Sequence, residues 1–118
     1  MTDKPHLDEE ALAELQDVME DEFEVLIQTY LADSRTRLDS LRQALEAGDV
    51  DAFAKTAHSF KGSCINIGAP RLGELCRNAE KIGQSESLAE APPVLEEIES
   101  EFQRVTEAFG ALMERGRG

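Results

Sequence analysis

The sequence is poor in large aromatic side chains and in positive charge. Its 118 residues include no Trp, one Tyr and five Phe, and 12 Lys and Arg stand against 25 Asp and Glu, for a net charge of −13. Sheets favour aromatic and β-branched residues, so this composition favours helices. Nucleic-acid binding needs a basic face that releases counterions from phosphates, so the negative charge argues against a nucleic-acid partner.

Long apolar runs and clustered metal ligands are also missing. No run approaches the roughly 20 residues that a membrane-spanning helix needs, and residues 1–10 are polar and acidic rather than a leader. We therefore expect a cytoplasmic protein that does not enter the membrane. Cys64 and Cys76 lack metal-site spacing and are expected to be reduced core thiols, while His6 and His58 lie far apart in the sequence, so no metal or other cofactor is expected.

Familiar catalytic motifs are absent as well. The sequence contains neither the G-x-S-x-G pattern of serine hydrolases nor a glycine-rich phosphate loop. An ATP site and intrinsic kinase activity are therefore not expected.

Apolar residues are present at helical spacing along most of the chain. Asp8 and Asp49 stand where N-caps are expected, and Gly48 and Gly68 where helices end. Pro70 can begin a helix and Gly83 is predicted to close it. The predicted helices cover about residues 9–19, 23–47, 50–67, 70–83 and 94–113, with a polar connection at 84–91.

Four of these helices can bury their apolar stripes against one another, because each has one stripe and the links are short. We predict an all-α fold, an antiparallel up-down four-helix bundle with a short accessory N-terminal helix. A chain of 118 residues suits one compact domain. Residues 1–118 are therefore predicted to form a single domain, with an ordered core at about 7–113, and the protein is expected to be a monomer.

His58 is the residue with the clearest chemical potential. On a helical wheel it falls at the edge of an apolar stripe, with Lys61 three residues on and Gly62 four residues on. Glycine inside a helix costs about 1 kcal/mol relative to Ala, so Gly62 suggests close approach of another surface. A neutral imidazole can attack a phosphoryl group, and Lys61 can offset the charge that results.

These residues resemble the signature of the histidine-containing phosphotransfer (HPt) domain family. The match consists of AHSFKGS at residues 57–63, followed by Gly68 and a second Leu-rich helix, with His58, Lys61, Gly62 and Gly68 in register. The resemblance implies a four-helix bundle phosphorylated on His58. It also implies transfer between receiver domains of hybrid sensor kinases and response regulators, which supply the Mg²⁺ and the acceptor aspartate.

One position departs from a common family pattern, in which a Gln on the following helix hydrogen-bonds the histidine ring. Alignment through Gly68 places Glu80 there. A carboxylate that accepts the Nδ1 proton would leave Nε2 as the nucleophile. The alternative is that Glu80 only pairs with Lys61 or Arg77.

A region of locally positive charge is predicted to face the acidic phosphorylation pocket of a receiver. Residues 50–83 hold five basic and three acidic side chains, a net +2, which leaves −15 for the rest of the chain. Complementary charge favours encounter. The predicted partner-binding residues are Lys55, Arg71, Lys81 and Ile65, with Leu12 or Leu15 from the first helix.

A competing hypothesis is a helical adaptor or anti-regulator that binds partner proteins through its bundle surface, with His58 incidental. It shares the predicted fold and acidity. The two hypotheses differ in whether His58 becomes phosphorylated. His6 is predicted to lie in a polar terminal tail without a chemical role.

Overall fold

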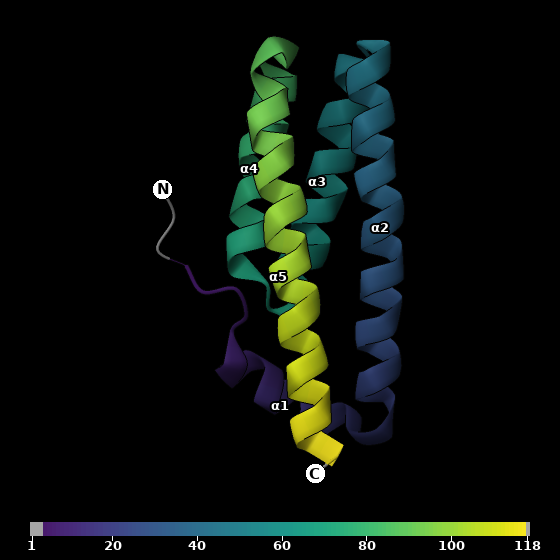
Figure 1. Cartoon of the computed structure of the whole chain (residues 1–118), viewed down its shortest axis with the longest axis vertical. Coiled ribbons are helices and arrows are strands. Elements are labelled where there is room, and N and C mark those ends of the chain that lie inside the picture. The colour runs from purple at the N-terminus through teal and green to yellow at the C-terminus, as the bar shows by residue number, and fades with distance from the viewer. Residues whose placement is uncertain (1–3, 118) are drawn as a thin grey trace.

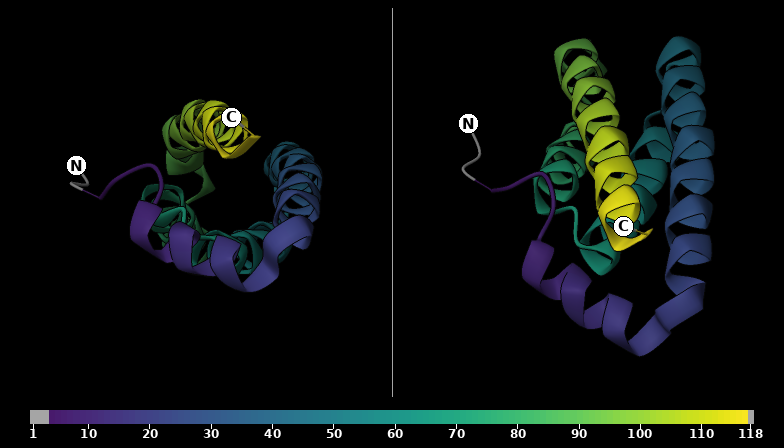
Figure 2. Two further views of the ribbon diagram at one scale, coloured as in Figure 1. Left: turned by 90° about the horizontal axis from the view of Figure 1, so that it is seen from below. Right: turned by 60° about the horizontal axis from the view of Figure 1, so that its bottom comes forward.

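The computed structural model describes residues 4–117, and its four long helices run alternately up and down around one core (Figure 1). This confirms the predicted all-α fold. The elements are α1 (Glu9–Met19), a 3-10 turn (Glu20–Glu22), α2 (Phe23–Ala47), α3 (Val50–Ile67), α4 (Pro70–Gln84), a second 3-10 turn (Leu88–Glu90) and α5 (Ala91–Arg117). The short helix α1 crosses one end of the bundle (Figure 2).

The helix ends follow local signals in the sequence. The side chains of Asp8 and Asp49 accept hydrogen bonds from backbone N–H groups three residues on, each at 3.1 Å. Gly48 and Gly68 end α2 and α3 in the left-handed region, with φ of 68° and 88°, where the lack of a Cβ removes the steric penalty. The described chain extends beyond the predicted ordered core at both ends.

Gly83 was predicted to close α4, and this is wrong, since α4 continues through it to Gln84. A Cβ on Gly83 would lie 2.9 Å from Ala54 Cβ and 3.0 Å from Ala54 Cα. The glycine therefore allows α3 and α4 to approach closely. A second difference is that α5 begins at Ala91, so that the two prolines occupy its first turn, where they leave no backbone donor unpaired.

The core is almost entirely apolar, and the buried Ser34 Oγ has no hydrogen-bond partner among the described residues. The rings of Tyr30 and Phe109 meet edge to face with centroids 6.0 Å apart, and the Tyr30 hydroxyl lies 3.2 Å from Cys64 Sγ. Burial raises the pKa of Tyr30. A hydrogen bond between Cys76 and Cys64, together with burial, raises the pKa of the Cys76 thiol. Both cysteines are free and buried, as predicted for core thiols.

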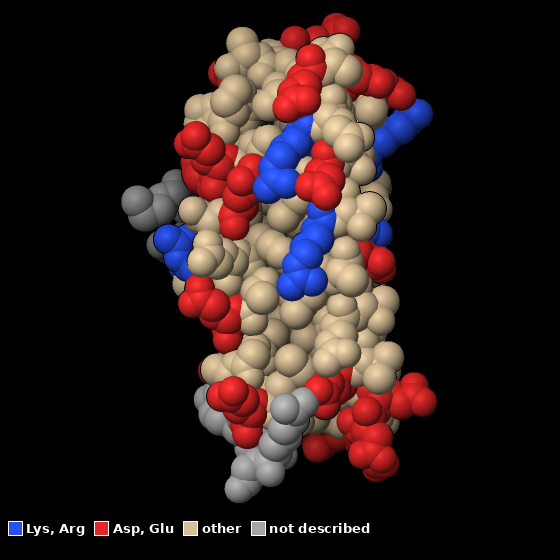
Figure 3. All heavy atoms as spheres, turned by 45° about the vertical axis from the view of Figure 1, so that its right-hand side comes forward, with Lys and Arg blue, Asp and Glu red and all other residues tan. Residues whose placement is uncertain are grey.

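Charge is unevenly distributed over the surface. On the face seen in Figure 3, acidic side chains gather toward both ends and basic ones lie mainly between them. Arg42 on α2 is linked to α5, with nitrogens 2.7 Å from Asp39 on its own helix and 3.2 Å from Glu99 on α5. Within residues 4–117, no helix combines the length and the apolar character needed to cross a membrane.

Candidate functional site

His58 lies midway along α3 with its ring turned outward. The buried side of this helix carries Phe53, Ala57 and Phe60, and His58 falls one residue past that stripe, so 67% of its side chain is exposed. The imidazole ring is therefore accessible from outside the molecule.

Glu80 on α4 faces His58 across the contact between the two helices. Its Oε2 lies 2.7 Å from His58 Nδ1, and its Oε1 accepts a hydrogen bond from Lys61 Nζ, also at 2.7 Å. The carboxylate is only 12% exposed. The two alternatives raised for Glu80 both hold in part, because it contacts the histidine ring and pairs with Lys61 at the same time.

The charge state of Glu80 fixes the tautomer of the histidine. The hydrogen bond from Lys61 lowers the pKa of Glu80 below its ordinary value of 4.5, and the bond from His58 adds to this against the opposing effect of burial. An ionised carboxylate only accepts hydrogen bonds. Nδ1 of His58 must therefore carry the proton, and Nε2 of the neutral ring keeps the free electron pair.

The two glycines of the motif have different roles in the structure. A Cβ built on Gly62 would have no heavy atom within 4 Å, so packing within the chain does not require glycine there. Gly68 has a φ of 88°, and its Cβ position lies 3.4 Å from Leu12 Cγ. Gly68 thus allows the turn between α3 and α4 and leaves room for α1 to pack. The open space on the surface is at Gly62.

Beside His58 the surface is hollowed where α1, α2 and α3 meet. The hollow has a volume of about 720 Å³. His58, Ser59 and Gly62 line it from α3, and Leu15 lines it from α1. Its other lining residues are Met19, Leu26, Thr29, Tyr30, Asp33, Arg37, Ser63, Asn66 and Ile67.

The predicted partner-binding residues are only partly brought together. Leu15 lines the hollow and Ile65 is 56% exposed on α3. Lys81 is exposed on α4, and Lys55 is exposed on α3 with its ammonium group 2.9 Å from Asp51. Leu12 requires a correction, because at 1% exposure it is a core residue that seats α1 on the bundle and offers no contact surface.

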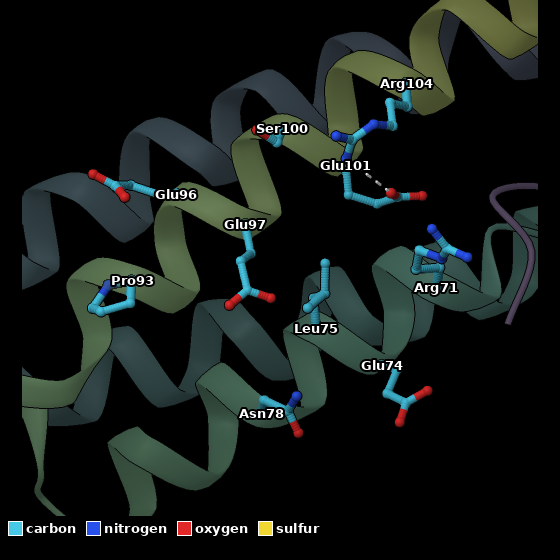
Figure 4. Close-up of a pocket in the computed structure, with 10 residues that line it drawn as sticks. All are labelled: Arg71, Glu74, Leu75, Asn78, Pro93, Glu96, Glu97, Ser100, Glu101 and Arg104. Carbon is cyan, nitrogen blue, oxygen red and sulfur yellow. Dashed lines mark ion pairs between the residues drawn. The ribbon is translucent and has the colours of Figure 1, made fainter. Parts of the chain in front are cut away.

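Arg71 lies away from His58, in a separate groove of about 980 Å³ between α4 and α5 (Figure 4). Its Nε donates a hydrogen bond to the Lys4 carbonyl at 2.6 Å. Glu80 points to roughly the opposite side of α4, since at about 100° per residue it is half a turn around the helix from Arg71. The groove is therefore a different face from the one around His58.

The same groove contains a buried carboxylate that sequence reasoning missed. Glu101 on α5 is 1% exposed, with Oε2 2.5 Å from His6 Nδ1 and Oε1 3.6 Å from Arg104 Nη1. His6 was expected to lie in a polar tail, and instead it ties the N-terminal segment to α5. No local pattern marks this pair, because its members are 95 residues apart.

Arg37 on α2 is another residue that sequence reasoning missed. It lines the hollow beside His58, and its Nε donates a hydrogen bond to Ser59 Oγ at 3.2 Å. In the sequence Arg37 is one of several charges on the outer side of a long helix. Only the packing of α2 against α3 shows that it faces the histidine side.

Comparison with known proteins shows the family to which the chain belongs. The model of the Hpt domain matches residues 25–108. Among solved structures, histidine-containing phosphotransfer protein B from Pseudomonas aeruginosa is 46% identical, with a TM-score of 0.90 over 94% of this chain and 96% of that one. No curated protein matches the sequence. On the extent of the domain match and the likeness of the structures, the chain belongs to the Hpt domain family and is a histidine phosphotransfer protein.

Proposed function

We propose that His58 Nε2 is the atom that carries the phosphoryl group, and that the protein moves this group between receiver domains of hybrid sensor kinases and response regulators. The observation that supports this most directly is the arrangement around the ring. Glu80 engages Nδ1 at 2.7 Å, and the side chain is otherwise two-thirds exposed. Nε2 is thus the ring nitrogen left for chemistry.

The transfer is a balanced exchange of one bond for another. As Nε2 forms a bond to phosphorus, the bond from phosphorus to the aspartyl oxygen of the first receiver breaks, and that aspartate leaves as a carboxylate. The Nδ1 proton stays on the ring, next to Glu80, and the carboxylate offsets the positive charge of the phosphorylated imidazole. In the onward step the phosphoryl group moves to the second receiver and the ring leaves as neutral imidazole.

Lys61 and Gly62 have supporting roles in this proposal. Lys61 holds the other oxygen of Glu80 at 2.7 Å and adds positive charge beside the phosphoryl group. Gly62 leaves room for the partner. Catalysis proper belongs to the receiver, which is expected to supply Mg²⁺ and the acceptor aspartate. In the described part of this chain, no group of three His, Cys, Asp or Glu side chains is arranged to hold a metal ion.

The receiver is proposed to dock over His58, on the hollow between α1, α2 and α3. Apolar side chains such as Leu15 line the hollow and Gly62 lies at its edge. Ile65, two turns further along α3, is 56% exposed. Leu15 and Ile65 offer apolar contact area of the kind found at the centre of protein interfaces.

A labelling experiment tests the proposal. The protein is incubated with a phosphorylated receiver domain, and the label on it is measured before and after acid and alkali treatment. We expect label that is lost in acid and kept in alkali, as for phosphohistidine. The variant His58→Gln should take up none, and His6→Gln should be labelled normally. Label retained in His58→Gln would overturn the assignment and favour an adaptor role.

A further inference from the structure

Several cations that face a neighbouring element are paired with a carboxylate there. Lys61 is bound to Glu80, Arg42 to Glu99, and Lys4 lies 3.7 Å from Glu74. Such pairing is expected in a chain with a net charge of −13, where carboxylates outnumber cations by two to one. A cation beside His58 without a carboxylate partner among the described residues can instead pair with a carboxylate of another protein.

Arg37 is such a cation. It forms no ion pair with the described residues, although Asp33 lines the same hollow one helical turn away. Its one hydrogen bond joins Nε to Ser59 Oγ at 3.2 Å. That bond leaves the donors of the two terminal guanidinium nitrogens available, and it restrains the side chain beside the residue that follows His58.

The position of Arg37 suits contact with a partner better than chemistry at the histidine. It belongs to α2, across the hollow, whereas the cation linked to the ring through Glu80 is Lys61. The guanidinium group presents a planar fork that matches a carboxylate, and part of its orientation is already set by Ser59.

From these observations we infer that Arg37 is a specificity-determining contact that binds an acidic side chain on the docking face of the receiver domain. The inference rests on the proposed function, because it places the partner over His58. Within that function it assigns the recognition of the partner's charge to α2. The gain is in partner specificity and encounter rate, since complementary charge acts mainly on these.

Transfer from a phosphorylated receiver, measured over a range of receiver concentrations, separates docking from chemistry. For Arg37→Ala we expect the half-saturating concentration to rise about fivefold to tenfold, with the rate at saturation within about twofold of the parent. Arg37→Lys keeps the charge and loses the planar fork, so its half-saturating concentration should lie between those of the parent and Arg37→Ala. The effect should shrink at high salt, where exposed charges are screened.

Arg35→Ala is the matched control, because Arg35 is an exposed cation on the same helix that does not line the hollow. Its half-saturating concentration should stay within about twofold of the parent. Equal effects of Arg37→Ala and Arg35→Ala would overturn the inference. Unchanged thermal unfolding of both variants would show that any difference does not come from a damaged fold.

A small phosphoryl donor separates the partner's charge from the phosphoryl group itself. Phosphoramidate needs no docking surface, so Arg37→Ala should be labelled by it at the parental rate. A slower reaction with phosphoramidate would mean that Arg37 acts on His58 or its phosphoryl group, and this would also overturn the inference. Failure of the parent protein to be labelled on His58 by a receiver would instead contradict the proposed function.

Discussion

At the scale of single residues, one carboxylate organises the site. Glu80 is 12% exposed and divides its two oxygens between His58 and Lys61. The bond from Lys61 keeps it ionised, and the ionised form keeps the proton on Nδ1. Relative to the glutamine of a common HPt pattern, Glu80 therefore adds a negative charge beside a ring that becomes positive in the proposed transfer.

Replacing Glu80 tests this role. Glu80→Ala should slow transfer about tenfold to a hundredfold, the usual cost of losing a partner that orients a histidine, while circular dichroism shows an intact bundle. Glu80→Gln should be less affected, because its amide oxygen can still accept the Nδ1 hydrogen bond. Parental rates in Glu80→Ala would reduce Glu80 to a structural ion pair.

The same residue predicts a dependence of stability on pH. The pKa of Glu80 is lower in the folded protein than its ordinary value of 4.5. The ionised carboxylate therefore stabilises the fold above pH 4.5, and this stabilisation is lost as the pH falls through the pKa of the folded state. Urea unfolding should show the parent more stable than Glu80→Gln at neutral pH, and this difference should narrow in acid. A difference that stays constant down to pH of about 3 would contradict it.

Gly62 should separate stability from docking. Gly62→Ala should stabilise the fold by about 0.5–1 kcal/mol, because Ala is the better helix former and the space is open. A larger side chain, as in Gly62→Gln, should still fold but raise the half-saturating receiver concentration. Gly110 in α5 has the same open surroundings, so Gly110→Gln is the control, and equal transfer by both glutamine variants would count against the docking role.

At the scale of the elements, local signals predicted most helix boundaries. Asp8, Asp49, Gly48 and Gly68 act within a few residues of their own positions, so their effect can be read from the sequence. Gly83 was misread because its function is a contact with Ala54, which is remote in the sequence. The same reason explains why Leu12 could not be recognised as buried and why Arg37 was missed.

The contact at Gly83 positions the site, since Gly83 lies one turn after Glu80 on the helix that packs against α3. Gly83→Ala places a methyl group 3.0 Å from Ala54 Cα and 3.1 Å from Ala54 N, and backbone atoms yield little. We expect a loss of about 1–3 kcal/mol in the free energy of unfolding. Transfer should slow as well, because α4 carries Glu80. Stability equal to that of Gly110→Ala would contradict this.

At the scale of the whole molecule, the pair of His6 and Glu101 joins the N-terminal segment to the middle of α5. The N-terminal segment lies along α4, with Arg71 bound to the Lys4 carbonyl, and His6 reaches the buried carboxylate on α5. The bundle itself was predictable from periodicity. This connection was not, because it depends on where a polar segment settles after the helices have packed.

Removing His6 should therefore destabilise the bundle. His6→Ala leaves the Glu101 carboxylate buried with only Arg104 at 3.6 Å, which we expect to cost about 1–3 kcal/mol in urea unfolding. Combining it with Glu101→Met should recover part of the loss, since no buried charge is then left unpaired. Phosphotransfer rates should not change, because the pair is on the far side of α4. An unchanged unfolding midpoint for His6→Ala would argue against the pair.

The arrangement of the site over two helix pairs has a consequence for how such proteins diverge. The ring and its carboxylate partner belong to α3 and α4, whereas much of the hollow beside the ring is lined by α1 and α2. Under the proposed docking, substitutions on α1 and α2 would redirect a duplicated copy to a new receiver while the reacting atoms stay in place. Partner choice and chemistry would then be inherited separately.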